Sequence, residues 1–225
     1  MVDREQISSF IHLDGYEASL DEEAVTAWVR ELAGNRDTYK KERSFKSTLR
    51  GVIKVKGGNY GWLLNQEEES QALLAHIEQG EKIHKEPAYT ERGKVWSSNY
   101  DIGDTYIEVD MGAQHMWFYK DGQLIVDTDV VTGNMSRRNG TPAMVASIQY
   151  KARNAVLRGR DYETPVSYWM PFYRNYGIHD ANWRARFGGD IYLTGGSHGC
   201  VNTPPAKMKI LFEEAERGTP VVLYY

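Results

Sequence analysis

The spacing of apolar residues changes near residue 100, and this change constrains the fold more than any other feature of the sequence. Apolar side chains alternate with polar or aromatic ones over residues 106–111 and again over 116–119. Successive side chains of a β-strand point to opposite faces of a sheet, so a two-residue period predicts strands. Asp121-Gly122 can form a hairpin turn to a partner strand at 124–131. The C-terminal half is therefore expected to be mostly antiparallel β structure.

The first half shows the apolar spacing of helices instead. Apolar residues recur every three or four positions in a predicted helix over 22–33, and Asp21 is its N-cap residue. Asn65 can cap a second helix that ends at Gly80. Residues 45–56 lie between the two helices and have the composition of strands. This half is expected to be α+β.

The chain has 225 residues, which is enough for two domains with a core each. We expect a smaller α+β domain over residues 1–98 and a mostly β domain, with short helices, over residues 99–225. In the second domain the sequence predicts strands at 166–173, 176–178, 191–193 and 220–225, a short helix at 181–187 capped by Asp180, and a helix that begins near Pro204.

Composition excludes several classes of function. The formal net charge is −4, and acidic and basic residues are spread over both halves, so no nucleic-acid partner is expected. No apolar run approaches the roughly 18 residues that a membrane-spanning helix needs, and the first residues do not resemble a secretory leader. No motif calls for a cofactor.

The only cysteine, Cys200, lies in the segment Ser197-His198-Gly199-Cys200-Val201-Asn202. A cysteine reacts as its thiolate, and only about 3% of an unperturbed thiol is ionised near neutral pH, so a nucleophile needs a neighbouring base. His179 follows the predicted strand 176–178, and the strand 191–193 that leads to Cys200 would run beside it. Neighbouring strand ends would bring both side chains to one cleft, where His179 would take the thiol proton and a third group would fix its tautomer.

The residues around Cys200 allow further hypotheses. Gly199 permits close approach of a substrate, so the N–H groups of Gly199 and Cys200 could converge on a developing oxyanion. His198 is expected to point away from Cys200 on an extended segment. Two alternatives stay open at this point: Cys200 is an inert buried hydrophobe, or it binds zinc with His179 and His198, although their spacing is not that of structural zinc sites.

The segment Ser197–Asn202, taken with Tyr176-Gly177-Ile178-His179, closely resembles the signature of the L,D-transpeptidase catalytic domain of the YkuD type. An upstream Asn139-Gly140-Thr141-Pro142 turn and a strand-rich C-terminal domain of the right length belong to the same resemblance, which covers residues from about 100 to 225. The first domain, with Tyr60-Gly61-Trp62, more loosely resembles the peptidoglycan-binding domain that precedes this catalytic domain in some Gram-positive members. The implied fold is a YkuD-like β-sandwich with short helices.

This resemblance implies an enzyme that cross-links the cell wall. In the family, the cysteine attacks the carbonyl of the third residue of a donor tetrapeptide stem, expels the terminal D-alanine and passes the acyl group to an acceptor amine, which makes a 3→3 cross-link. The resemblance implies that Cys200 is the nucleophile, that His179 is the general base, and that the backbone carbonyl of Ser197 orients His179. It also implies that Gly199 and His198 line the site and its oxyanion hole. Asn202 and Trp183 would shape the pocket, and Tyr162 would lie in a substrate loop.

The chain departs from the family pattern at Met144, where many relatives carry glycine, and at Asn202, where many carry arginine. The resemblance further implies peptidoglycan stem peptides as partners, an extracytoplasmic location at the cell wall, and acylation of Cys200 by carbapenems. No membrane anchor is evident, so we expect this chain to be the extracellular part of a longer protein. Two other functions stay open: an L,D-carboxypeptidase that gives the acyl group to water, and a non-catalytic wall-binding module.

Overall fold

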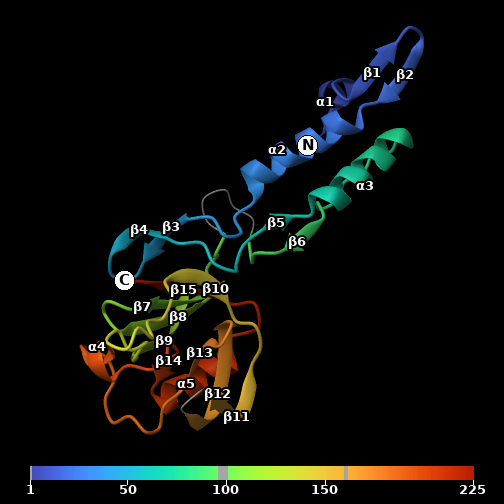
Figure 1. Ribbon diagram of the computed structural model, residues 1–225. Helices are drawn as coiled ribbons and strands as arrows, with labels where there is room; N and C mark the ends of the chain where they lie inside the picture. The colour runs from blue at the N-terminus through green and yellow to red at the C-terminus, as the bar shows by residue number, and fades with distance from the viewer. Residues whose placement is uncertain (1, 96–100, 160–161) are drawn as a thin grey trace. The chain divides into compact units, whose positions relative to one another are not determined.

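The computed structural model describes residues 2–95, 101–159 and 162–225 (Figure 1). The chain forms two compact units, one made of residues 1–38 and 62–92 and the other of residues 39–61 and 93–225. The units therefore differ from a division at residue 98, because residues 39–61 pack with the C-terminal half. No helix in the described ranges is long and apolar enough to cross a membrane.

The first unit is α+β, as expected. It contains α1 (Arg4–Ser8), β1 (Ile11–Asp14), β2 (Glu17–Leu20), α2 (Glu22–Arg36), β5 (Leu63–Leu64), α3 (Gln66–Glu78) and β6 (Tyr89–Glu91). Asp21 caps α2 by accepting the Ala24 N–H at 2.9 Å, and Asn65 caps α3 in the same way. The small core of this unit consists of Val29, Ala33 and Leu64, against which Trp28, Leu32, Leu73 and Tyr89 pack.

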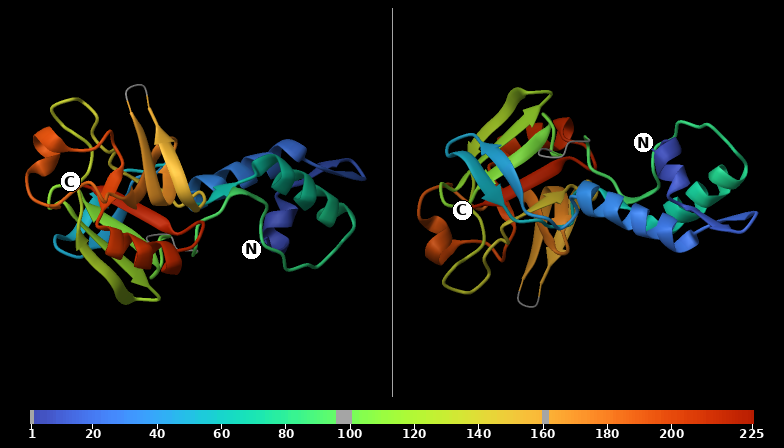
Figure 2. Two further views of the ribbon diagram at one scale, coloured as in Figure 1. Left: turned by 90° about the horizontal axis from the view of Figure 1, so that it is seen from below. Right: turned by 90° about the horizontal axis from the view of Figure 1, so that it is seen from above.

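The second unit is a sandwich of two sheets, which confirms the predicted fold class. One sheet has the strand order β10-β15-β7-β8-β9, and the other has the order β11-β12-β13-β14. The bounds are β7 (Tyr106–Asp110), β8 (His115–Lys120), β9 (Gln123–Asp129), β10 (Met144–Ser147), β11 (Ala152–Arg158), β12 (Glu163–Tyr173), β13 (Tyr176–Asp180), α4 (Ile191–Gly195), β14 (Val201–Thr203), α5 (Pro205–Glu214) and β15 (Pro220–Tyr224). Figure 2 shows β11 and β12 as a long hairpin at the edge of the second sheet.

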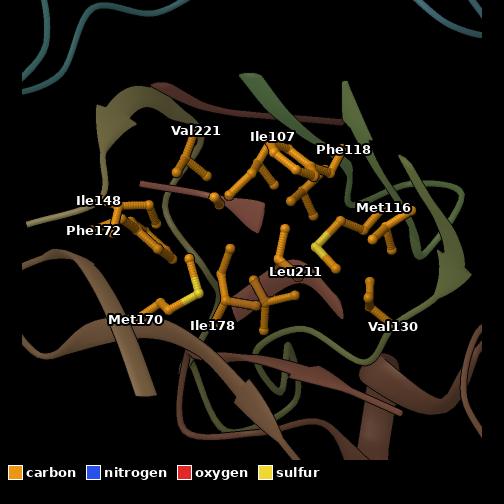
Figure 3. Close-up of a cluster of buried hydrophobic side chains, with 14 of the residues drawn as sticks. Ile107, Met116, Phe118, Val130, Ile148, Met170, Phe172, Ile178, Leu211 and Val221 are labelled. Carbon is orange, nitrogen blue, oxygen red and sulfur yellow. The ribbon is translucent and has the colours of Figure 1, made fainter. Parts of the chain in front are cut away.

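The core of the second unit lies between these sheets and α5. Its side chains come from the alternate positions that the two-residue period indicated, so Ile107 and Phe118 of the first sheet face Met170 and Ile178 of the second (Figure 3). Leu211 of α5 completes the same cluster. Burial of this apolar surface fixes the strands whose ends carry the candidate site.

Residues 39–61 belong to this unit through a hairpin of β3 (Arg43–Ser47) and β4 (Gly51–Val55). Phe45 and Val55 are buried in one cluster with Val222 of β15. The Arg50 guanidinium makes two hydrogen bonds to the fully buried Asp110 carboxylate, at 2.6 and 2.8 Å. These long-range contacts explain why a boundary drawn from local composition does not coincide with the units.

Two predicted elements near the site are wrong. Residues 191–193 form part of helix α4 rather than a strand, since a short apolar run has no periodicity that separates the two structures. Residues 181–187 form turns rather than a helix. Asp180 does not cap a helix there, because its carboxylate accepts the backbone N–H groups of Ser167 and Tyr168 on β12, at 3.2 and 2.8 Å.

Candidate active site

His179 is the last residue but one of β13, and Cys200 immediately precedes β14, which pairs with β13 in parallel. The pairing of β13 with β14 places Ile178 opposite Val201 and His179 opposite Asn202. The strand that pairs with β13 on this side is thus the one that follows Cys200, not the segment 191–193 that precedes it. The two residues come from neighbouring strands, as expected, but His179 is near the C-terminal end of β13 and Cys200 precedes the N-terminal end of β14.

The loop that presents Cys200 requires glycine at position 199. Gly199 has a φ of +117°, and a Cβ atom there would lie 2.3 Å from Cε1 of Tyr176. Thr141 fixes this turn from the outside, because its hydroxyl donates to the Gly199 carbonyl at 2.7 Å and accepts the Gly133 N–H at 2.9 Å. The Asn139-Gly140-Thr141-Pro142 turn therefore supports the cysteine loop directly.

His179 is oriented by its own neighbour in sequence. Its Nδ1 lies 2.8 Å from the Asp180 carbonyl oxygen, so Nδ1 carries the proton and Nε2 is the acceptor. The side chain is 4% exposed, and the rings of Trp169 and Trp183 lie 6.0 and 5.9 Å from the imidazole, centroid to centroid.

The Ser197 carbonyl does not orient His179, contrary to expectation. That carbonyl accepts the Asn134 N–H at 2.8 Å. The Ser197 hydroxyl instead donates to the Cys200 carbonyl at 2.6 Å and accepts the Gly199 N–H at 3.0 Å. Ser197 therefore holds the cysteine loop rather than the histidine. Because the Gly199 N–H is engaged there, the Cys200 N–H is the remaining donor of the pair expected to form an oxyanion hole.

A second chain of hydrogen bonds reaches His179 from the other side. The partners of the Asn202 amide fix its orientation: the nitrogen donates to Nε2 of His179 at 3.2 Å, and the oxygen accepts from Nε and Nη2 of Arg184 at 2.7 and 3.3 Å. Nη1 of Arg184 donates to the Gly195 carbonyl at 3.0 Å. Asn202 therefore links the imidazole to a cationic side chain.

These residues open into a cavity of about 210 Å³. Of the eight residues expected to form the site, all but Gly199 line it, and the other described lining residues are Leu157, Thr164, Arg184 and Gly196. His198 does not point away from Cys200 as expected, since the positive φ of Gly199 bends the segment and both residues line the cavity. The Tyr162 ring stacks on His198 with centroids 4.5 Å apart.

The protonation states follow from burial. Desolvation raises the pKa of the Cys200 thiol to about 11, and a hydrogen bond with the Gly177 backbone opposes this effect only in part. The thiol also donates to the Asn175 carbonyl at 3.6 Å. Burial lowers the pKa of His179 below its ordinary value; the Asp180 carbonyl opposes this, and the Arg184 charge adds to it. Both shifts favour a thiol and a neutral imidazole over an ion pair at neutral pH.

Sequence reasoning missed four residues of this arrangement. Asp180 was assigned to a helix cap, and Arg184 to the interior of that helix. Thr141 carried a visible signal, because it belongs to the turn that contributed to the family resemblance. Asn134 gave none, since its contact with Ser197 joins distant parts of the chain. His179, His198 and Cys200 do not form a cluster that could hold a metal ion, nor does any other such group in the described residues.

A thiol and an imidazole in one cavity of a sandwich domain are the groups that cysteine-dependent acyl transfer uses. Residues 104–223 match the family model of the L,D-transpeptidase catalytic domain, YkuD. Residues 4–84 match a family described as "Putative peptidoglycan binding domain". The chain belongs to the L,D-transpeptidase family.

Solved structures support this membership over nearly the whole chain. The structure of a cysteine-to-serine mutant of Enterococcus faecium L,D-transpeptidase is 39% identical, with a TM-score of 0.85, over 96% of this chain and 88% of that one. The Ldtfm–avibactam carbamoyl enzyme is also 39% identical, with a TM-score of 0.85, over 97% of this chain and 87% of that one. The E. faecium catalytic domain acylated by ertapenem is 49% identical, with a TM-score of 0.50, over 54% of this chain and 98% of that one. Among curated proteins, none matches this chain.

Proposed function

We propose that this L,D-transpeptidase makes 3→3 cross-links in peptidoglycan through an acyl-enzyme on Cys200. The observation that carries the proposal is the cavity shared by Cys200 and His179 within a domain of this family. The donor is a tetrapeptide stem whose third residue supplies the acyl group, and the acceptor is an amine of a second stem.

In the first step, Nε2 of His179 takes the thiol proton as Sγ of Cys200 attacks the carbonyl carbon of the third residue. The Asp180 carbonyl holds the Nδ1–H tautomer, so the basic nitrogen is the one that faces away from Asp180. The Cys200 N–H stabilises the oxyanion of the tetrahedral intermediate. The imidazolium then returns its proton to the leaving nitrogen, the C–N bond breaks, and D-alanine departs from a thioester.

In the second step, the acceptor amine attacks the thioester and gives its proton to His179. Collapse of the intermediate breaks the C–S bond, forms the new amide and regenerates the Cys200 thiol. Water competes with the amine at the thioester, so transfer requires an acceptor held close to a site that excludes water. The buried position of both side chains supports transfer over hydrolysis.

The first unit supports a location at the cell wall. The match of residues 4–84 to a peptidoglycan-binding family supports the proposal that the first unit is an accessory domain that binds the wall and brings the catalytic unit to its substrate. We accordingly propose that the protein works outside the cytoplasm, at the cell wall and the outer face of the membrane.

The test is to incubate the wild type and Cys200→Ala with a disaccharide-tetrapeptide donor and an amine acceptor and to measure product masses. The expected product is a cross-linked dimer that has lost one D-alanine and is absent with Cys200→Ala. A tripeptide alone would identify an L,D-carboxypeptidase, and no Cys200-dependent product would identify a wall-binding module. A carbapenem is expected to add to the wild type and not to Cys200→Ala in intact-mass spectra.

A further inference from the structure

Arg184 carries a positive charge into the cavity, and no carboxylate of the described residues pairs with it. Its donors reach only neutral acceptors, the Asn202 amide oxygen and the Gly195 carbonyl. Burial lowers its pKa, and no acidic group in the described part of the chain opposes this effect. The positive charge of a half-buried guanidinium is not neutralised by uncharged partners, so a bound anion would stabilise it.

The cavity around Arg184 is suited to an anion. None of its described lining residues is acidic, and His179 and His198 are the other titratable groups of basic type there. Arg184 uses three N–H groups on Asn202 and Gly195, and a guanidinium has five, so two remain for a ligand. Paired N–H groups of this kind match the two oxygens of a carboxylate.

The donor of the proposed reaction has a carboxylate close to the reacting bond. The carbonyl that Cys200 attacks belongs to the residue immediately before the C-terminal D-alanine, so the terminal carboxylate lies about one residue, or 3.5 Å of extended chain, beyond the reacting bond. Arg184 is one bridging amide away from His179, the base at that bond. We propose that Arg184 binds the C-terminal carboxylate of the donor stem and thereby selects stems that end at the residue to be expelled. This inference rests on the proposed function.

The position of Arg184 gives such binding a second effect. The Arg184 charge is one of the causes that lower the pKa of His179. A carboxylate bound to Arg184 offsets that charge, so the imidazole becomes a stronger base when the donor is in place. The leaving D-alanine then takes its carboxylate away with it, which clears this subsite before the acceptor reacts.

The test compares a tetrapeptide donor with the same donor as its C-terminal carboxamide. In the wild type the acid is expected to exceed the amide at least about 10-fold in kcat/KM. In Arg184→Gln the kcat/KM for the acid should fall at least about 10-fold while the kcat/KM for the amide changes little, so the ratio of acid to amide approaches 1. Arg184→Lys should retain part of the preference for the acid. Arg186→Gln is the matched control, because Arg186 is exposed, lies two residues further on and does not line the cavity; its ratio should equal that of the wild type.

An equal loss for acid and amide in Arg184→Gln would overturn the inference, since it would mean that Arg184 only positions Asn202. Binding to Cys200→Ala separates this inference from the proposed function, because it needs no turnover. Titration calorimetry should give tighter binding of the acid than of the amide to Cys200→Ala and no preference in the Cys200→Ala, Arg184→Gln double variant. Equal binding of acid and amide to Cys200→Ala would overturn the carboxylate subsite, whereas a preference without turnover would leave the subsite standing and reject the transpeptidase step.

Discussion

Asn202 stands directly opposite His179 in the parallel pairing of β13 and β14, and its amide nitrogen donates to Nε2 of the imidazole. This hydrogen bond stabilises the neutral form of His179, because only the neutral ring has a free acceptor nitrogen. The same nitrogen must take the thiol proton, so Asn202 holds the base ready and gives up its bond as the reaction begins.

Asn202→Ala removes that restraint. We expect the rate of Cys200 acylation to fall about 10-fold, because the imidazole loses one of its two fixed partners. The pKa of His179 should rise, since the lost bond favoured the neutral ring, and the acid limb of the pH–rate profile should move to higher pH. Acylation by a carbapenem, followed by intact mass from pH 5 to 8, measures both effects. An unchanged acid limb would contradict the role of Asn202 at Nε2.

The raised pKa of the Cys200 thiol gives a separate prediction about its reactivity. With a pKa of about 11, only about one thiol in 10⁴ is ionised at pH 7, so alkylation by iodoacetamide should be slow. The alkylation rate should rise about tenfold per pH unit from pH 7 to 10. Mass spectrometry of the intact protein measures this rate cleanly, because the chain has one cysteine. A plateau below pH 8 would mean that the resting site is a thiolate–imidazolium pair.

Slow alkylation would not make Cys200 inert. Alkylation depends on the thiolate present in the free enzyme, whereas acylation by a substrate takes the proton to neutral His179 during attack. Substrate acylation should therefore persist at neutral pH and fall only as His179 becomes protonated, below the ordinary histidine value of about 6.5 because burial lowers its pKa.

Gly199→Ala tests the conformation of the cysteine loop. A Cβ atom would lie 2.3 Å from the Tyr176 ring, and the positive φ adds backbone strain of about 1–3 kcal/mol. We expect a loss of at least about 2 kcal/mol in the free energy of unfolding and an acylation rate at least about 100-fold lower, measured by denaturant unfolding and carbapenem mass shift.

Gly195→Ala is the matched control for this loop. Gly195 lies in α4, and a Cβ there would meet only Cγ2 of Ile191, at the ordinary contact distance of 3.7 Å. Its free energy of unfolding should stay within about 0.5 kcal/mol of the wild type. If Gly199→Ala were equally mild, the loop would be free to move away from Tyr176.

The fold could be predicted from the sequence where the pattern is local and repeated. The two-residue period predicted the strands β7 and β8, and the N-cap residues Asp21 and Asn65 marked α2 and α3, whereas the short helix α1 was not predicted. The structure of short segments was harder to predict, because residues 191–193 contain too few apolar positions to distinguish a helix from a strand.

The candidate site divides in the same way. Cys200 and His179 stand out by residue type and motif, whereas their supports depend on distant contacts that no spacing reveals. The Thr141 hydroxyl meets the Gly199 carbonyl across 58 residues of sequence. The positive φ of Gly199 turns His198 toward the cavity, and an assumption of extended backbone could not give this.

Arg50→Ala tests whether residues 39–61 are part of the second unit. The variant leaves the fully buried Asp110 carboxylate without its paired hydrogen bonds from the guanidinium, and breaking a buried ion pair in this way costs about 3–5 kcal/mol. We expect a loss near the lower end, because the Arg50 side chain is itself 41% exposed. The measurement is denaturant unfolding followed by the near-ultraviolet signal of the tryptophans. Arg158→Ala is the control, since its pair with Glu163 is exposed on both sides and should contribute less than about 0.5 kcal/mol. Equal losses of unfolding free energy in the two variants would mean that the contact of Arg50 with Asp110 does not stabilise the packing of the β3–β4 hairpin against its sheet.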